Sequence, residues 1–150
     1  MTETKKNYFW LVLSIGITVF IWHNSLQDAV NSERASLYFV ALVRRLLAVT
    51  TASFSISWLD HVLRKLAHLT EFAALGYALM SLFVHLQVSK LWHNVGNVLA
   101  LGFIIASVDE CLQLFSVGRS CQFSDVCLDL VGVIVGVLVA WVVKRVRGLR

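Results

Sequence analysis

The feature that most constrains this chain is a series of apolar runs of about 20 residues, which recur along its 150 residues. A helical run of that length spans the ~30 Å hydrocarbon core of a bilayer. Hydrophobic residues make up 58% of the chain and charged residues only 15%, whereas soluble domains contain about 25% charged residues. We therefore expect an all-α, polytopic membrane protein that forms one domain, residues 1–150.

Four helices are expected to cross the membrane, at residues 7–27, 58–89, 91–116 and 124–144. The first of these runs carries no formal charge. The second is preceded by Ser57 and contains Asp60, the S-x-x-D form of a helix start. Only Lys90 separates the second run from the third, and a connection this short predicts an antiparallel pair.

Residues 32–57 do not fit a membrane span. Their apolar residues have amphipathic spacing, but Arg44 and Arg45 interrupt the run. A helix of this kind is stable when it lies in the headgroup plane, with its apolar face toward the lipid. We therefore expect a short interfacial amphipathic helix between the first and second membrane helices.

The basic residues indicate how the chain is oriented. Four spans place both termini on one side, together with seven of the 13 Lys and Arg residues. The terminal clusters flank the membrane ends closely, which is where the positive-inside rule acts, so both termini are expected in the cytoplasm. The net charge of +4 fits lipid headgroups and this topology. The chain has no basic stripe with interleaved aromatics that would predict a nucleic-acid partner.

Three cysteines occur close together, at positions 111, 121 and 127. They form neither a CxxC pair nor a zinc-type Cys/His spacing. We expect them to be small buried residues of membrane helices. A disulfide between Cys121 and Cys127 is the alternative if they face an oxidising compartment.

The predicted topology gathers the embedded polar residues at the outer end of the bundle. The second helix begins at that end, the third finishes there, and the fourth begins there again. Because ionisable residues at membrane depth mark functional sites by default, this cluster is the candidate site. It consists of Arg64, Lys65, His68, Glu71, Asp109, Glu110, Gln113, Arg119, Asp125 and Asp129.

The fourth helix combines acids with small residues on one face. Asp125 and Asp129 lie one and two turns before the Gly132-x-x-x-Gly136 motif, with the same helical spacing. GxxxG motifs let membrane helices approach closely. The glycines are therefore predicted to pack against a neighbouring helix, and the acids to point into the bundle.

Two alternatives accompany this cluster. His68 and Glu71 have an HxxE spacing that could chelate a metal, but the sequence indicates no third ligand. We therefore expect neither a metal nor a cofactor, and interpret His68 as a hydrogen-bonding residue. The second alternative is purely structural, with Arg64 or Arg119 pairing with nearby acids and locking the helix ends.

The polar residues also carry a resemblance to a known family. Residues 63–76, LRKLAHLTEFAALG, resemble the RKxxHxxEF/Y-xxLG signature of VanZ-like membrane proteins. Residues 109–132 resemble that family's DExxQxF…GR…D…N/DxxG block, and residues 24–27 are similar to its weaker polar motif after the first helix. The resemblance extends over essentially the whole chain. Val117 stands where the family often has Pro, and Asp129, which adds a charge, where Asn is common.

The resemblance implies a small multi-helix protein of the bacterial cell envelope, located in the inner membrane. The family is named for an accessory protein of resistance to the lipoglycopeptide teicoplanin. It supplies no established reaction, so we transfer neither resistance nor an enzymatic activity to this chain.

Three functions are compatible with these residues. In the first, Arg64, Lys65 and Arg119 hold the anionic group of an amphipathic envelope molecule, such as a lipid-linked phosphate, a glycan precursor or a lipoglycopeptide. The second is a structural or assembly subunit, with the charges as an ion-pair lock. The third is a proton-coupled transporter, which with four spans would require a homo-oligomer. Membrane lipids are the expected partners throughout.

Overall fold

The computed structural model describes residues 3–27, 41, 45, 55–86 and 91–146. In this part of the chain it contains four α-helices and no strand: α1 (Glu3–Ser25), α3 (Ile56–Leu86), α4 (Leu91–Gln113) and α5 (Phe123–Val146). All four are long and apolar enough to cross a membrane, which confirms the all-α fold and the four spans. The expected interfacial helix falls almost entirely outside the described residues, and the single domain over residues 1–150 stays a prediction.

Several helix ends differ from the predicted ones by one to four residues, and two of these differences have a local reason. The α3 helix begins at Ile56, because Ser55 and not Ser57 caps it: the Trp58 N–H donates to Ser55 Oγ, at 3.3 Å. The α4 helix ends at Gln113, three residues early, because the chain tightens there. The Leu114 N–H donates to the carbonyl of Cys111, three residues back, at 3.2 Å.

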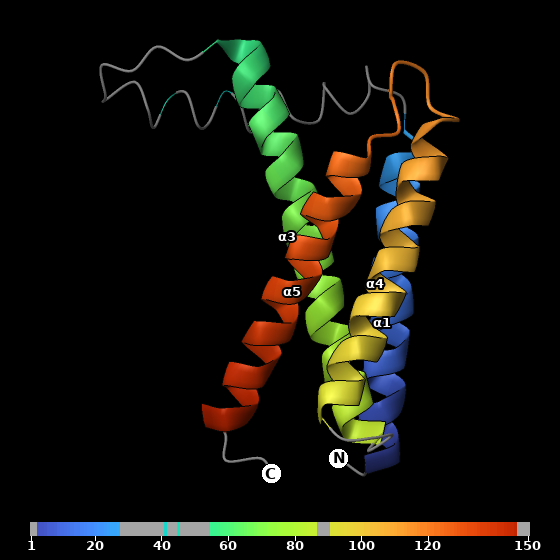
Figure 1. The fold of residues 1–150 in the computed structure, drawn as a ribbon, viewed down its shortest axis with the longest axis vertical. Helices are drawn as coiled ribbons and strands as arrows, with labels where there is room; N and C mark the ends of the chain where they lie inside the picture. The colour runs from blue at the N-terminus through green and yellow to red at the C-terminus, as the bar shows by residue number, and fades with distance from the viewer. Residues whose placement is uncertain (1–2, 28–40, 42–44, 46–54, 87–90, 147–150) are drawn as a thin grey trace.

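The four helices run up and down between two ends of a bundle. Figure 1 shows α3 and α5 crossing each other, while α1 and α4 lie side by side. At one end α1 and α4 finish and α3 and α5 begin; we call this the polar end, and the opposite one the terminal end. With 31 residues, α3 is about 46 Å long, which is longer than a ~30 Å hydrocarbon core.

The α3–α5 crossing is built on glycines. A Cβ atom on Gly132 would lie 2.6 Å from the carbonyl oxygen of Leu69. One on Gly136 would overlap the carbonyl oxygen of Ala73, also on α3. The two backbones therefore meet without side chains between them, as small residues permit in membrane helices.

The distribution of buried and exposed apolar side chains is that expected of a protein surrounded by lipid. Phe72, Leu75, Val98 and Val133 are buried where α3, α4 and α5 meet. Large apolar residues such as Val12, Ile104 and Leu138 are exposed on the outward faces of α1, α4 and α5. Such faces suit a bilayer, because lipid chains are as apolar as the side chains themselves.

The three cysteines do not take part in this packing. Cys111, Cys121 and Cys127 are all free and exposed, so the expectation of buried cysteines is wrong. On α4, Cys111 follows the buried Glu110, and successive helical residues point about 100° apart. Cys127 likewise follows the buried Val126, so both thiols face away from the bundle.

Candidate functional site

A cavity of ≈ 200 Å³ lies at the polar end, between the first turns of α3 and α5, the last turn of α4 and the α4–α5 connection. Eight of the ten candidate residues line it: Arg64, Lys65, His68, Glu110, Gln113, Arg119, Asp125 and Asp129. Glu71 and Asp109 are not part of the lining. His61, Ser120 and Gln122 add polar groups that the sequence analysis did not include.

The basic residues of α3 already have acidic neighbours. Lys65 Nζ lies 2.8 Å from Asp125 Oδ1, which joins α3 to α5 across the cavity. Arg64 pairs instead with Asp60, one turn earlier on α3, at 3.0 Å. The Arg64–Asp60 pair was not predicted from the sequence, because an acid in the first turn of a helix is already explained by the helix dipole.

Glu110 fastens the end of α4 to the beginning of α5. Its side chain is 1% exposed, and both oxygens are satisfied. Gln113 Nε2 donates to Oε1 at 2.7 Å, and the backbone N–H of Gln122 donates to Oε2 at 2.9 Å. Glu110 therefore positions the connection that carries Arg119.

Asp109 lies deeper and joins α4 to α1. Ser25, at the last residue of α1, donates its hydroxyl to Asp109 Oδ1 at 2.6 Å, and both residues are fully buried. Ser116 Oγ donates in turn to the carbonyl of Ser25, at 2.8 Å. Gln113 Nε2 makes a longer contact with Asp109 Oδ2, at 3.4 Å.

Glu71 is held by α1 in the same way. Asn24 Nδ2 donates to Glu71 Oε1 at 3.1 Å, while Oε2 is buried without a hydrogen-bond partner. Asn24, Ser25 and Ser116 are thus site residues that the sequence analysis missed. For Asn24 and Ser25, the sequence signal that could have found them was the polar stretch of residues 24–27, which the topology places at the polar end.

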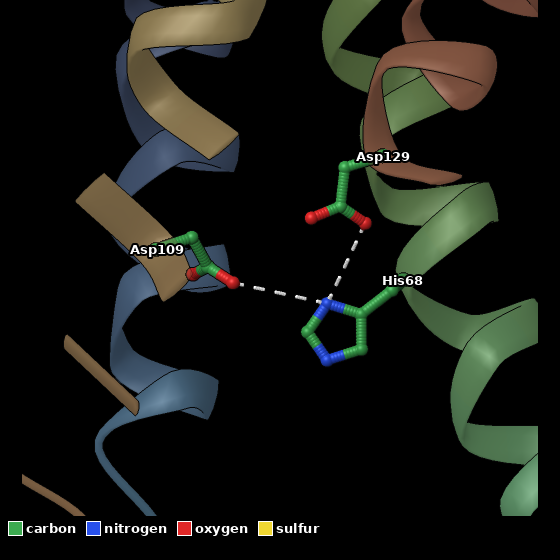
Figure 2. Close-up of side chains that lie close together, drawn as sticks. All are labelled: His68, Asp109 and Asp129. Atoms are coloured by element: carbon green, nitrogen blue, oxygen red, sulfur yellow. Dashed lines mark ion pairs between the residues drawn. The ribbon is translucent and has the colours of Figure 1, made fainter. Parts of the chain in front are cut away.

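His68 lies between two acids on other helices. Its Nδ1 atom is 3.9 Å from Asp109 Oδ2 and 4.0 Å from Asp129 Oδ1. Figure 2 shows the imidazole of α3 facing the carboxylates of α4 and α5. The residues that could hold a metal ion together with His68 are therefore Asp109 and Asp129, and not Glu71, the partner in the HxxE alternative.

Arg119 reaches the cavity from the α4–α5 connection. It follows Gly118, whose φ of 80° lies in the left-handed region that favours glycine. Burial lowers the pKa of the Arg119 guanidinium, and the positive charge of Arg64 lowers this pKa further. Both guanidinium groups line the same cavity, and the carboxylates of Asp109 and Glu110 shift the Arg119 pKa in the opposite direction.

A comparison with family models adds to this geometry. The model described as VanZ/LLP1 matches residues 8–144, which include most of α1 and α5, all of α3 and α4, and every residue of the cavity. No curated protein and no solved structure matches the chain. The match extends over far more than half of the sequence, so this multi-pass membrane protein belongs to the VanZ/LLP1 family.

Proposed function

We propose that the polar end binds the phosphate group of an amphipathic, lipid-linked molecule of the bacterial cell envelope. The observation that carries the proposal is the pair of guanidinium groups, Arg64 and Arg119, in one cavity. Guanidinium groups bind phosphate oxygens in bidentate fashion, and an anion between two of them relieves their mutual repulsion.

The location of the cavity favours a lipid-linked ligand. With 31 residues, α3 is longer than the hydrocarbon core, so its first turns would extend beyond the core at the polar end and a headgroup would reach the cavity from the interface while its chains stay in the bilayer. Beside the guanidinium groups, the Lys65–Asp125 pair and the Gln113 amide are polar groups at the right depth for the hydroxyls of a headgroup.

The proposal is tested with the full chain in lipid nanodiscs. We expect it to retain a polyprenyl phosphate and not the corresponding polyprenol. Arg64→Gln and Arg119→Gln should each weaken retention about tenfold to a hundredfold, because a hydrogen bond between charged groups contributes ~1.5–3 kcal/mol. Lys144→Gln, which removes a positive charge at the terminal end, is the matched control and should have no effect.

The same experiment separates this function from a structural lock. If the charges only hold the helix ends together, Arg119→Gln lowers the thermal unfolding temperature, and the nanodiscs show no preference for the phosphate over the polyprenol. Equal retention of the two lipids contradicts the proposal.

We also propose that the polar end faces outward across the inner membrane, with both termini in the cytoplasm. The exposed thiol of Cys121 makes this testable in intact cells. With Cys111 and Cys127 changed to Ser, a membrane-impermeant maleimide should label Cys121 directly. A cysteine introduced by Lys144→Cys should react only after permeabilisation, and the reverse pattern would invert the topology.

A further inference from the structure

His68, Asp109 and Asp129 form a group that the proposed phosphate contact does not use. The three residues come from α3, α4 and α5, and each offers one ligand atom. These three atoms lie within 4.8 Å of one another. We propose that the three side chains bind one divalent transition-metal ion, such as Zn²⁺.

The spacing of the ligand atoms suits an ion at their centre. Zn²⁺ lies about 2.1 Å from imidazole nitrogens and carboxylate oxygens, so two ligand atoms of a tetrahedral site are ~3.4 Å apart. The two distances from His68 Nδ1, 3.9 Å and 4.0 Å, are about 0.5 Å longer than this. Because all three atoms lie within 4.8 Å of one another, rotation of the two aspartate side chains brings them to bonding distance.

The donor set is also appropriate. Imidazole is a preferred ligand of Zn²⁺ and other first-row cations, and carboxylates complete their coordination and neutralise their charge. Two carboxylates and a neutral imidazole match the charge of a divalent ion. Catalytic zinc sites likewise have three protein ligands of N and O type and one open position.

Asp129 provides a second and independent sign of a ligand. The residue is 1% exposed, and its Oδ2 atom is buried without a hydrogen-bond partner. Figure 2 shows both of its oxygens directed into the space between Asp109 and His68. A buried ionised oxygen without a partner is costly, and a bound cation would remove that cost.

A hydrogen bond from α1 orients the Asp109 carboxylate so that it can coordinate a metal ion. The Ser25 hydroxyl holds Asp109 Oδ1 at 2.6 Å, which leaves Oδ2 facing His68. Metal-binding sites commonly fix their ligands through such outer hydrogen bonds. The hydroxyl that joins α1 to α4 would thus also orient a metal ligand.

The cavity gives such an ion access to water. His68 and Asp129 belong to its lining, whereas Asp109 lies behind them. An ion held by the three residues would therefore have its open coordination position toward the cavity. The site stands on its own geometry, but an ion there would add positive charge beside Arg64 and Arg119 and could contact the same phosphate.

The test uses the full chain in detergent, stripped with a chelator and dialysed against Zn²⁺ without any phosphate. We expect about one saturable Zn²⁺ per chain. His68→Gln and Asp129→Asn should each weaken binding at least about a hundredfold, and Ser25→Ala about tenfold, within the range seen for outer-shell partners. Because no lipid is present, the result is independent of the phosphate experiment.

Two controls locate the ion. His93→Gln removes an exposed imidazole at the first turn of α4, at the terminal end, and should leave Zn²⁺ binding unchanged. Glu71→Gln removes the acid of the HxxE spacing and should also bind normally. Circular dichroism checks that each variant is folded, and the visible absorption of Co²⁺ bound to the unmodified chain reports its ligands without any substitution.

The proposal is overturned if the unmodified chain shows no saturable Zn²⁺ binding. In that case a proton shared between Asp109 and Asp129 would neutralise their negative charge. The proposal is equally overturned if folded His68→Gln and Asp129→Asn bind Zn²⁺ as the unmodified chain does. Loss of binding in Glu71→Gln with retention in Asp129→Asn would place the ion at the HxxE residues instead.

Discussion

Two cavities at opposite ends of this bundle show how different a polar and an apolar space are in a membrane protein. The cavity at the polar end measures ≈ 200 Å³ and is lined by ionisable groups of α3, α4, α5 and the α4–α5 connection. Toward the terminal end lies a larger cavity of ≈ 360 Å³. Its lining is apolar: Met80, Leu91, Trp92, Val95, Leu99, Ile134, Val137, Leu138 and Trp141.

The difference lies in what each space requires of its neighbours. Lipid chains can occupy the apolar cavity and make the contacts that side chains would otherwise make. The polar cavity has no such substitute, because each buried charge there needs a partner within hydrogen-bonding distance. Polarity and not volume therefore distinguishes the functional end.

The largest loss of stability is expected when the α3–α5 crossing, whose helices contribute to both cavities, is forced apart. Gly136→Leu would place a side chain against the Ala73 carbonyl at the α3–α5 crossing. We expect a loss of about 3 kcal/mol, at the upper end of typical overpacking costs, or failure to fold. Thermal unfolding in detergent measures this. Gly96→Ala is the control, because a Cβ there meets nothing within 4 Å.

A substitution at the polar end should have the next largest effect. Asp109→Ala removes the acceptor of the Ser25 hydroxyl and leaves that buried donor without its partner. We expect a loss of about 1–3 kcal/mol, the desolvation cost of an unsatisfied buried group. Thermal unfolding of Asp109→Ala and Ser25→Ala, alone and together, checks this coupling. Strict additivity of the two effects would show that the hydrogen bond contributes little.

The half-exposed ion pair at the rim of the polar cavity should matter less. Lys65 and Asp125 are 2.8 Å apart, with side chains 36% and 27% exposed, so water screens their attraction. Lys65→Gln should cost only about 0.2–1 kcal/mol, as exposed pairs do. The effect should shrink when unfolding is repeated at high salt. A loss of stability as large as that of Asp109→Ala would mean that the Lys65–Asp125 ion pair holds the helix ends together.

The smallest effect is expected in the apolar cavity. Leu138→Ala shortens a side chain that is 55% exposed on the outward face of α5. In lipid nanodiscs we expect a change within about 0.5 kcal/mol, the usual range for surface positions. A loss comparable to that of Asp109→Ala would mean that a protein surface, and not lipid, fills this space.

Much of the fold could be predicted because membranes permit few solutions. Apolar runs of spanning length must be helices, and short connections make consecutive helices antiparallel. Counting the spans then assigns residues 64–71 and 109–129 to one end, although they are far apart in the sequence. The cysteines were mispredicted because composition says which residues tolerate lipid, but not which face of a helix each one takes.

The partners within the polar end could not be predicted, since helical spacing places residues on faces and does not rotate one helix against another. Plausible partners of Arg64 on other helices were Asp109, Glu110 and Asp125, yet Arg64 pairs with Asp60 on its own helix. The spacing offered Glu71 as an alternative partner of His68, yet Asn24 donates to that carboxylate and His68 faces Asp109 and Asp129.

The sequence by itself determined the family, the four membrane helices and the end at which the charged residues gather. The helices and the end follow from hydropathy and spacing along the chain, and the family follows from the polar motifs that resemble it. Only the tertiary structure decided that α1 supplies Asn24 and Ser25, and that His68 faces Asp109 and Asp129. The physical reason is the glycine crossing: the close approach of α3 and α5 sets the rotation of both helices, and this rotation selects which side chains meet.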